Sequence, residues 1–287
     1  MRFSGLTVRF VSPTTIKLSD CLEALRCEDC EDVDAQYTVE LLTTPLVPGT
    51  TPVYKDGSTD IFLTDKGCLR IYSPLTHEDG CQVACLLCKD GNNTLYYPAA
   101  RWDDYYRKYW HCAHLIAGEE LLSLHKAVLL HSSVVEYDGK AVLFSGPSGA
   151  GKSTQADLWK KHLGAEIING DRCVIMERDG AFFGGGSLWC GSSGIYSPRQ
   201  LPIAGIFILR HGDENRATRL YSRAFAPLFS QTTLNSWNNE FMNNVTDIYS
   251  KLIETIPVYE LECRVDKDAV LLAKSLIFPD HTEKETV

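Results

Sequence analysis

Residues 143–154 read Leu-Phe-Ser-Gly-Pro-Ser-Gly-Ala-Gly-Lys-Ser-Thr, and this stretch decides the fold. Gly146, Gly151, Lys152 and Ser153 fill the pattern G-x-x-x-x-G-K-[ST] of a phosphate-binding loop, or P-loop. The glycines allow a tight turn whose successive amide N–H groups point at one anion. The lysine adds a positive charge for the β- and γ-phosphates, and the serine hydroxyl is placed to bind Mg²⁺. We therefore expect a nucleotide site formed by Gly146, Ser148, Gly149, Ala150, Gly151, Lys152, Ser153 and Thr154.

The residues on either side of this stretch have the order of elements that a P-loop requires. Residues 141–144 are a short apolar run, which is typical of a buried strand entering the loop. Ala156, Trp159 and Leu163 recur at helical spacing, and Gly164 stands where a helix C-cap is expected. The order strand, loop, helix favours a P-loop over a glycine-rich turn that binds nothing.

Composition and charge restrict the class of protein. The chain has 287 residues, of which 44% are hydrophobic and 23% charged, as in a globular protein of one large or two modest domains. The formal net charge of −9 argues against nucleic acid or an anionic membrane as the main partner. No apolar run approaches the roughly 18 residues of a membrane span, and no signal-peptide core is found. We expect a cytoplasmic protein whose 11 cysteines are reduced thiols.

The first hundred residues favour β-structure. Two hairpins are expected, at residues 65–67 and 90–93, because each of these turn sequences lies between short apolar runs. Apolar and aromatic side chains recur on one stripe from Trp102 to His125, which indicates a long connecting helix. Further helices are expected through Trp237–Leu252 and from the capping residue Asp266 to Leu276. The expected division is a β-rich region 1–101, a connecting helix 102–125, a P-loop domain 126–280 and a disordered tail 281–287.

The spacing of cysteines leaves a zinc site open as an alternative to buried thiols. Cys27/Cys30 and Cys85/Cys88 are two C-x₂-C pairs, but their separation exceeds the usual spacing of zinc ribbons. Residues three apart on a strand also point to opposite faces. The run His111-Cys112-Ala113-His114 lies in the expected aromatic helix, so packing is favoured there as well.

Two titratable residues lie one element away from the P-loop. His131 lies inside the expected strand 128–135, which a short turn joins to the P-loop strand as an antiparallel hairpin. This hairpin brings His131 towards the end of the sheet where the loop lies; a core histidine is the alternative. Asp171 follows the next expected strand, and an acidic residue there is the usual second Mg²⁺ ligand beside Ser153. Its alternative is an ordinary turn carboxylate. The glycine-rich residues 184–194 can close over substrate or serve as a linker.

The order of these motifs resembles the catalytic domain of HPr kinase/phosphorylase. Leu130-His131, the P-loop and the early Ile-Asn-Gly-Asp-Arg at residues 168–172 carry the resemblance, and ATP-dependent phosphoenolpyruvate carboxykinases share the layout. Residues 188–191 and 195–199 look similar to stand-alone HPr-kinase-like proteins, some of which phosphorylate serine in a precursor peptide. The resemblance covers about residues 126–278 and only loosely the β-rich region.

This resemblance implies an α/β fold, in which a P-loop domain with a mixed sheet follows a smaller β-rich region. It implies ATP and Mg²⁺ as cofactors, with Lys152 and Ser153 on the triphosphate and metal and His131 in the catalytic centre. Asp171 matches the second of two adjacent aspartates in the family, and Gly170 replaces the first. The C-terminal signature loop of HPr kinase is not found. Homo-oligomers are implied as well, since HPr kinase relatives form hexamers.

The expected function is an ATP- and Mg²⁺-dependent kinase that phosphorylates a hydroxyl, best a serine of a peptide or small protein. Asp171, His131 and Lys152 are its expected catalytic residues, and Ser153 and Asp171 its metal ligands. A small metabolite is the alternative acceptor, while no basic clusters of a carboxykinase are found. A different class, a nucleotide-sensing regulator without turnover, is supported by the missing aspartate. No Leu-Ser-Gly-Gly-Gln run indicates an ABC-type ATPase.

Overall fold

The chain is a mixed α/β protein with two mixed sheets. Its computed structural model divides into two compact units, the first of residues 1–121 with 236–238 and the second of residues 122–235 with 239–287. Each unit contains one eight-stranded sheet. The structure describes residues 1–18, 20–28, 31–73, 76, 80–108, 115–195 and 197–279.

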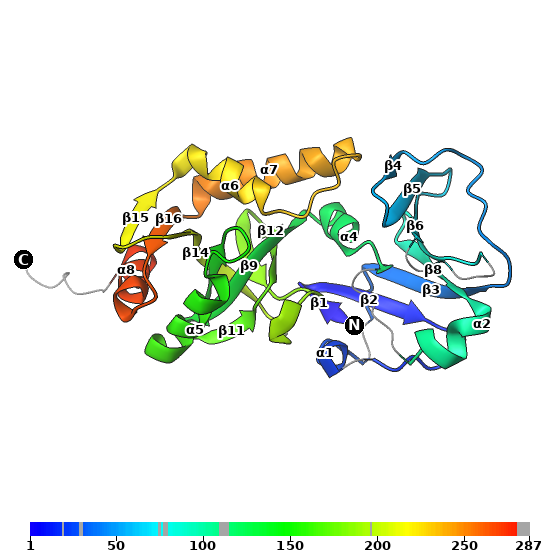
Figure 1. Ribbon diagram of the computed structural model, residues 1–287, viewed down its shortest axis with the longest axis horizontal. Helices are drawn as coiled ribbons and strands as arrows, with labels where there is room; N and C mark the ends of the chain where they lie inside the picture. Colours follow the sequence, from blue (N-terminus) through cyan, green and yellow to red (C-terminus); the bar gives the residue numbers. More distant parts are fainter. Residues whose placement is uncertain are drawn as a thin grey trace, which may run out of the picture. The chain divides into compact units, whose positions relative to one another are not determined.

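The sheet of the first unit has the strand order β1-β2-β3-β8-β7-β6-β5-β4 (Figure 1). The pairs β2–β3 and β3–β8 are parallel and the other neighbours are antiparallel. Both expected hairpins are present, as β5–β6 and β7–β8. The strands are β1 (Arg2–Phe3), β2 (Leu6–Val11), β3 (Ala35–Leu42), β4 (Tyr54–Lys55), β5 (Thr59–Leu63), β6 (Cys68–Tyr72), β7 (Val83–Leu87) and β8 (Asn92–Pro98).

The expected continuous helix over 102–125 is wrong. The helix α2 (Ala99–Arg101) ends before this segment, whose described part contains a π-helical turn η2 (Trp102–Tyr106) and α4 (Gly118–Leu124). Ala117 has a left-handed φ of 48°, which ends any helix that approaches α4. The aromatic stripe instead packs on the sheet, with the rings of Trp102 and Tyr106 at 5.3 and 5.0 Å from Tyr97. The run His111-Cys112-Ala113-His114 lies outside the described residues.

A buried arginine of β6 holds distant segments together within the first unit. The Arg70 guanidinium forms an ion pair with Glu119 and lies 3.7 Å from the Glu120 carboxylate. It also lies 5.8 Å from the ring centre of Trp237. Trp237 was expected in a helix, but α7 begins at Asn239, and Trp237 contacts this arginine instead. Because Arg70 is 7% exposed, its charge depends on these partners.

The sheet of the second unit combines a parallel centre with antiparallel neighbours. Its strand order is β10-β9-β12-β13-β14-β16-β15, with β11 on β9 and a further parallel pairing of β10 with β14. The carboxyl ends of β10, β14 and β16 therefore meet at one edge. The strands are β9 (Ala127–Tyr137), β10 (Lys140–Ser145), β11 (Glu166–Asn169), β12 (Arg172–Arg178), β13 (Ala181–Gly185), β14 (Gln200–His211), β15 (Arg216–Arg219) and β16 (Val258–Cys263).

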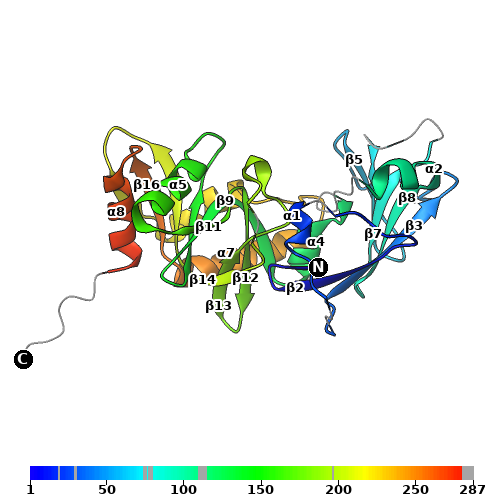
Figure 2. The ribbon, with the colours of Figure 1, turned by 90° about the horizontal axis from the view of Figure 1, so that it is seen from below.

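Helices cover both faces of this second sheet (Figures 1 and 2). Alternate residues of β10 face opposite ways, as a strand requires: Ala141 and Leu143 pack towards α6 and α7, Val142 and Phe144 towards α5 and α8. The unit is thus a three-layer sandwich with two apolar cores. Its helices are α5 (Lys152–Leu163), α6 (Phe225–Ser230), α7 (Asn239–Thr255) and α8 (Lys267–Ile277), with short 3₁₀ turns η3 (Gly191–Ser193) and η4 (Tyr221–Ala224).

Several local predictions in this unit are confirmed. Gly164 caps α5 with a left-handed φ of 70°, and the Asp266 side chain accepts a hydrogen bond from the Ala269 N–H at the start of α8. The hairpin of β9 and β10 is antiparallel, as expected. Gly184 and Gly185 belong to β13 rather than to a loop, so the glycine-rich loop is shorter than expected.

The cysteines only partly match the expectation of reduced thiols. Cys27 is disulfide-bonded, so the prediction of a reduced thiol is wrong for this residue. The prediction rested on an expected cytoplasmic location, which does not determine whether two thiols lie within bonding distance. Among the described residues, no group of three or more His, Cys, Asp or Glu side chains could hold a metal ion. No described helix is both long and apolar enough to cross a membrane. No disulfide is formed by the described residues Cys68, Cys81, Cys85, Cys88, Cys173, Cys190 and Cys263.

Candidate phosphate-transfer site

The P-loop connects β10 to α5 at the edge where the parallel strands end. Gly151 precedes the first residue of α5 with a left-handed φ of 96°, which allows the loop to turn directly into the helix. Gly146 approaches the neighbouring strand β14 closely, because a Cβ atom there would lie 3.3 Å from the Leu209 carbonyl oxygen. The sequence therefore folds into a compact loop whose amides lie at the N-terminus of α5, where an anion is favoured.

Lys152 is the buried cation of this loop. Its side chain is directed back over the loop, and Nζ donates hydrogen bonds to the carbonyl oxygens of Gly146 at 2.9 Å and Pro147 at 3.0 Å. Burial lowers the pKa of Lys152, while the negative charge of Asp171 acts in the opposite direction. The lysine is 8% exposed, whereas Ser148, Gly149 and Ser153 are exposed. The loop thus presents open backbone and hydroxyl groups around a lysine that a phosphate could draw from its carbonyl partners.

A histidine that the sequence reasoning missed contacts the P-loop. His211 is the last residue of β14, and its Nε2 lies 2.8 Å from the Gly149 carbonyl oxygen. A carbonyl oxygen only accepts, so Nε2 carries the proton in this contact. The parallel pairing of β10 with β14 brings His211 to the loop, and no sequence motif marks this residue.

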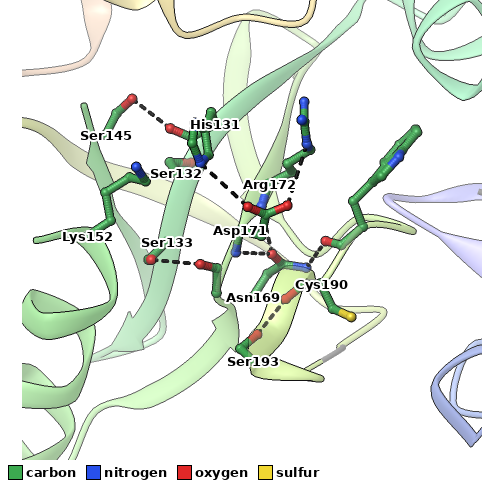
Figure 3. A network of polar contacts seen from close by, with 12 residues as sticks. His131, Ser132, Ser133, Ser145, Lys152, Asn169, Asp171, Arg172, Cys190 and Ser193 are labelled. Carbon is green, nitrogen blue, oxygen red and sulfur yellow. Dashed lines mark hydrogen bonds and ion pairs between the residues drawn. The ribbon is translucent and has the colours of Figure 1, made fainter. Parts of the chain in front are cut away.

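The hairpin of β9 and β10 places His131 beside Asp171. His131 pairs with Arg172 across the ladder of β9 and β12, and its carbonyl oxygen accepts a hydrogen bond from Ser145 Oγ at 2.9 Å. Its Nε2 lies 3.5 Å from Asp171 Oδ1 (Figure 3). The His131 side chain is 31% exposed, so it is not a core histidine. Two residues separated by forty positions in sequence therefore form one pair in the fold.

Asn169 shapes the turn that carries Asp171. Its Oδ1 accepts hydrogen bonds from the N–H groups of Asp171 and Arg172, both at 2.9 Å. The hydrogen bond with His131 is the largest influence on the pKa of Asp171 and lowers it, as do the charges of Arg172 and Lys152, against the opposing effect of burial. Asp171 is accordingly a carboxylate at neutral pH, held in a fixed position.

Arg172 is the last residue of the run 168–172, but no role was assigned to it from the sequence. Its Nε lies 3.5 Å from Asp171 Oδ2, on the oxygen opposite to His131, and its Nη1 donates to Thr233 Oγ1 at 2.5 Å. Thr233 is fixed in turn, because its N–H donates to the Leu129 carbonyl oxygen at 3.0 Å. The guanidinium therefore has a defined place at the site, with about a third of its side chain exposed.

The segment from Ser187 to Arg199 is anchored against this turn. Asn169 Nδ2 donates to the Trp189 carbonyl oxygen at 2.9 Å, and Ser187 Oγ donates to the Arg172 carbonyl oxygen at 2.8 Å. At its far end Arg199 forms ion pairs with Glu136 and Glu166. Of the two readings that the sequence left open, these contacts fit a loop held at the site better than a free linker.

The structure gives a physical reason for a glycine at position 170. A Cβ atom at Gly170 would lie 2.5 Å from Ser193 Oγ and 2.7 Å from Ser193 Cβ. Ser193 is itself fixed, since its Oγ donates to the Cys190 carbonyl oxygen at 2.6 Å. The anchored loop therefore occupies the space that a side chain at position 170 would need, and Asp171 is the one carboxylate of this turn.

The assembled site can bind an anion and orient a polar group beside it. The structure brings together the P-loop, Lys152, His131 and Asp171, which were selected from the sequence, and adds Arg172 and His211. One carboxylate and an exposed serine hydroxyl fit a Mg²⁺ ion, which is commonly held by one or two carboxylates together with the phosphates of a substrate. Ser153 and Asp171 are the residues of the required chemical type.

Comparison with solved structures finds distant likenesses, of which one is described. The HPr(Ser) kinase/phosphatase from Coxiella burnetii is similar with a TM-score of 0.28 and 12% sequence identity, over 52% of this chain and 93% of that chain. No protein-family model matches this chain, and no curated protein matches it.

Proposed function

We propose that this chain is an ATP- and Mg²⁺-dependent phosphotransferase that transfers the γ-phosphate to a hydroxyl group. The observation that carries the proposal is the pair His131–Asp171, which lies beside the Lys152 of a complete P-loop. Phosphoryl transfer requires positioning and charge stabilisation more than covalent chemistry by the protein. The site offers both: a loop for the phosphates and a carboxylate for the attacking group.

In this proposal the P-loop amides and Lys152 bind the β- and γ-phosphates. Lys152 exchanges its two carbonyl acceptors for phosphate oxygens, and charge-assisted hydrogen bonds of this kind are stronger than those between neutral groups. The desolvated position of the lysine makes its charge more effective at the transferring phosphate. Ser153 and Asp171 would hold Mg²⁺, which supplies charge neutralisation between the phosphates when bound.

Asp171 and His131 orient the acceptor hydroxyl. The lowered pKa of Asp171 keeps it a hydrogen-bond acceptor, so the carboxylate can receive the proton of the hydroxyl as the oxygen attacks phosphorus. His131 holds one oxygen of this carboxylate and fixes its rotation. The acceptor that we propose is a serine of a peptide or small protein, on the strength of the motif order that resembles HPr kinase; a small metabolite is the second acceptor class.

A nucleotide-sensing regulator without turnover is the candidate from another class. One observation favours it: the turn has a single carboxylate, and each of its oxygens faces a nitrogen of His131 or Arg172. With one nitrogen on each oxygen, the carboxylate has a single remaining lone pair on each oxygen for Mg²⁺ or an acceptor. The two functions differ in whether Asp171 also binds Mg²⁺ and the acceptor when nucleotide is present.

Transfer of label from γ-labelled ATP to peptides and proteins encoded beside this chain tests the proposal. We expect a labelled product with the unaltered chain, a loss of nucleotide affinity in Lys152→Ala, and a loss of transfer with retained nucleotide affinity in Asp171→Asn. Lys160→Ala, in the last turn of α5, is the matched control. If both site variants changed nucleotide affinity alone, and no product carried label, the regulator would replace the kinase.

A further inference from the structure

The site contains more positive charge than the proposed nucleotide chemistry uses. Lys152 serves the phosphates and His131 holds Asp171, which leaves Arg172 without an assigned partner from the substrate. Its Nε and Nη1 face Asp171 and Thr233, while for Nη2 no partner is found among the described residues. A guanidinium offers five N–H donors in a planar fork that suits carboxylate and phosphate oxygens. An anion is therefore expected at the outer edge of Arg172.

The position of Arg172 shows which part of a substrate this anion belongs to. Figure 3 shows Lys152 on the His131 side of the Asp171 carboxylate, while Arg172 faces the other carboxylate oxygen. In phosphoryl transfer the attacking oxygen and the leaving oxygen are roughly in line through phosphorus. If Lys152 holds the phosphates and Asp171 the attacking hydroxyl, the body of the acceptor continues beyond Asp171, on the side of Arg172.

Two further contacts prepare the guanidinium for recognition. Thr233, which is tied to β9 through its own N–H, fixes Nη1. Asp171 is one negative charge that faces two cations, Arg172 and Lys152, so it balances only part of the local charge. The chain as a whole carries a net charge of −9, so this positive site is a local exception and would favour anionic ligands over cationic ones.

From these contacts we infer that Arg172 is a specificity-determining residue that binds a carboxylate close to the phosphorylated hydroxyl of the acceptor. The inference rests on the proposed kinase function and narrows it to acceptor peptides with an acidic residue beside the serine. A paired carboxylate would complete the donors of Arg172 and leave Asp171 free to orient the hydroxyl. Arginine suits this task better than lysine, because a fork can contact Asp171, Thr233 and an acceptor carboxylate together.

The test measures transfer from γ-labelled ATP with Mg²⁺ to N-acetylated, C-amidated peptides with one serine, in which one flanking position at a time is Glu, Gln or Lys. At one flanking position, we expect kcat/KM to be about tenfold higher for the Glu peptide than for the Gln peptide, as a charge-assisted contact would give. Arg172→Gln should abolish this ratio, and Arg172→Glu should favour the Lys peptides. Arg172→Lys keeps the positive charge and should retain part of the preference for Glu over Gln. This result would show that the other variants lose the preference through the lost charge and not through a folding defect.

Arg178→Gln is the matched control, since Arg178 lies at the other end of β12, and it should keep the Glu preference. Binding of a fluorescent ADP should be unchanged in every variant. Equal rates for Glu and Gln peptides, or an equal loss for all peptides in Arg172→Gln, would overturn the inference while the kinase function stood. If the chain bound fluorescent ADP but no peptide became labelled, the proposed peptide acceptor would be overturned, and this inference with it.

Discussion

Ser193 fills the space beside the Cα atom of Gly170. A Cβ atom at position 170 would lie 2.7 Å from Ser193 Cβ, closer than such atoms approach in folded proteins. Position 170 and the loop that contains Ser193 therefore constrain one another. A chain with a carboxylate at position 170 needs a different loop, and this loop needs a glycine.

The close approach of Gly170 and Ser193 predicts that Gly170→Asp lowers the stability of the second unit. Ser193→Gly, added to this variant, should recover part of the lost stability. Overpacking of this kind costs about 1–3 kcal/mol in the free energy of unfolding. Urea denaturation of the single and double variants measures it, and limited proteolysis reports whether residues 187–199 are released. Ser193→Gly alone is the control. A Gly170→Asp variant as stable as the unaltered chain would mean that the loop moves aside at no cost.

A second prediction concerns His211, whose Nε2 donates to the Gly149 carbonyl oxygen. In the proposed function this contact holds the loop in the shape that binds phosphate. His211→Ala should therefore weaken ADP binding about fivefold, the equivalent of one hydrogen bond. His211→Gln can place an amide N–H near the same carbonyl and should recover part of the affinity. Calorimetric titration with ADP measures both.

His162→Ala, in the last turn of α5, is the control for this histidine series and should bind ADP normally. Thermal denaturation separates a loss of affinity from a loss of folding. Should His211→Ala bind ADP as tightly as the unaltered chain, the contact with Gly149 would be incidental to nucleotide binding.

The local elements of the second unit, including the strand and helix on either side of the P-loop, could be predicted from the sequence. Each depends on neighbours in the chain: a glycine C-cap after α5, an aspartate cap before α8, and a turn between apolar runs. Sequence reasoning selected His131 and Asp171 because each lies one element from the loop. It did not select His211, because only the parallel pairing of β10 with β14 brings this residue to the loop. Arg172 follows Asp171 in the chain, but its contact with Thr233 depends on the fold and gave no signal in the sequence.

The errors have the same physical origin. The aromatic stripe after Trp102 looks helical in periodicity, yet its rings pack on Tyr97 and the backbone turns at Ala117. Trp237 continues the spacing of the helix that follows, but it lies against Arg70. In both cases a tertiary contact of an aromatic side chain outweighs the helical pattern, and such contacts are not encoded at short range.

Arg70 itself gives a prediction on stability. Its removal in Arg70→Ala leaves Glu119 and Glu120 without their cation in a largely buried place, which should cost about 3–5 kcal/mol in the free energy of unfolding. Replacing the carboxylates as well, by Glu119→Gln and Glu120→Gln, should recover part of this loss. Arg26→Ala is the control, because its pair with Glu23 is solvent-exposed and worth about 1 kcal/mol or less. Chemical denaturation of these three variants and the unaltered chain measures the difference. An Arg70→Ala chain as stable as Arg26→Ala would contradict the prediction.

The last prediction follows from the pKa of Asp171. The hydrogen bond with His131 and the charges of Arg172 and Lys152 lower this pKa in the folded chain, while the unfolded value is about 3.9. A group with a lowered folded pKa stabilises the fold above its unfolded pKa, and this contribution is lost as the pH falls through the folded value.

The unaltered chain should therefore be more stable than Asp171→Asn at pH 7, and the difference should shrink only below about pH 4. Denaturation of both chains at several pH values between 7 and 3 measures this difference. Asp157→Asn, on the outer face of α5, is the control and should give no such trend. A difference that already disappears between pH 7 and 5 would mean that Asp171 takes up its proton in this range, so that its pKa in the folded chain is raised rather than lowered. The carboxylate would then lose its charge within the range where a kinase works.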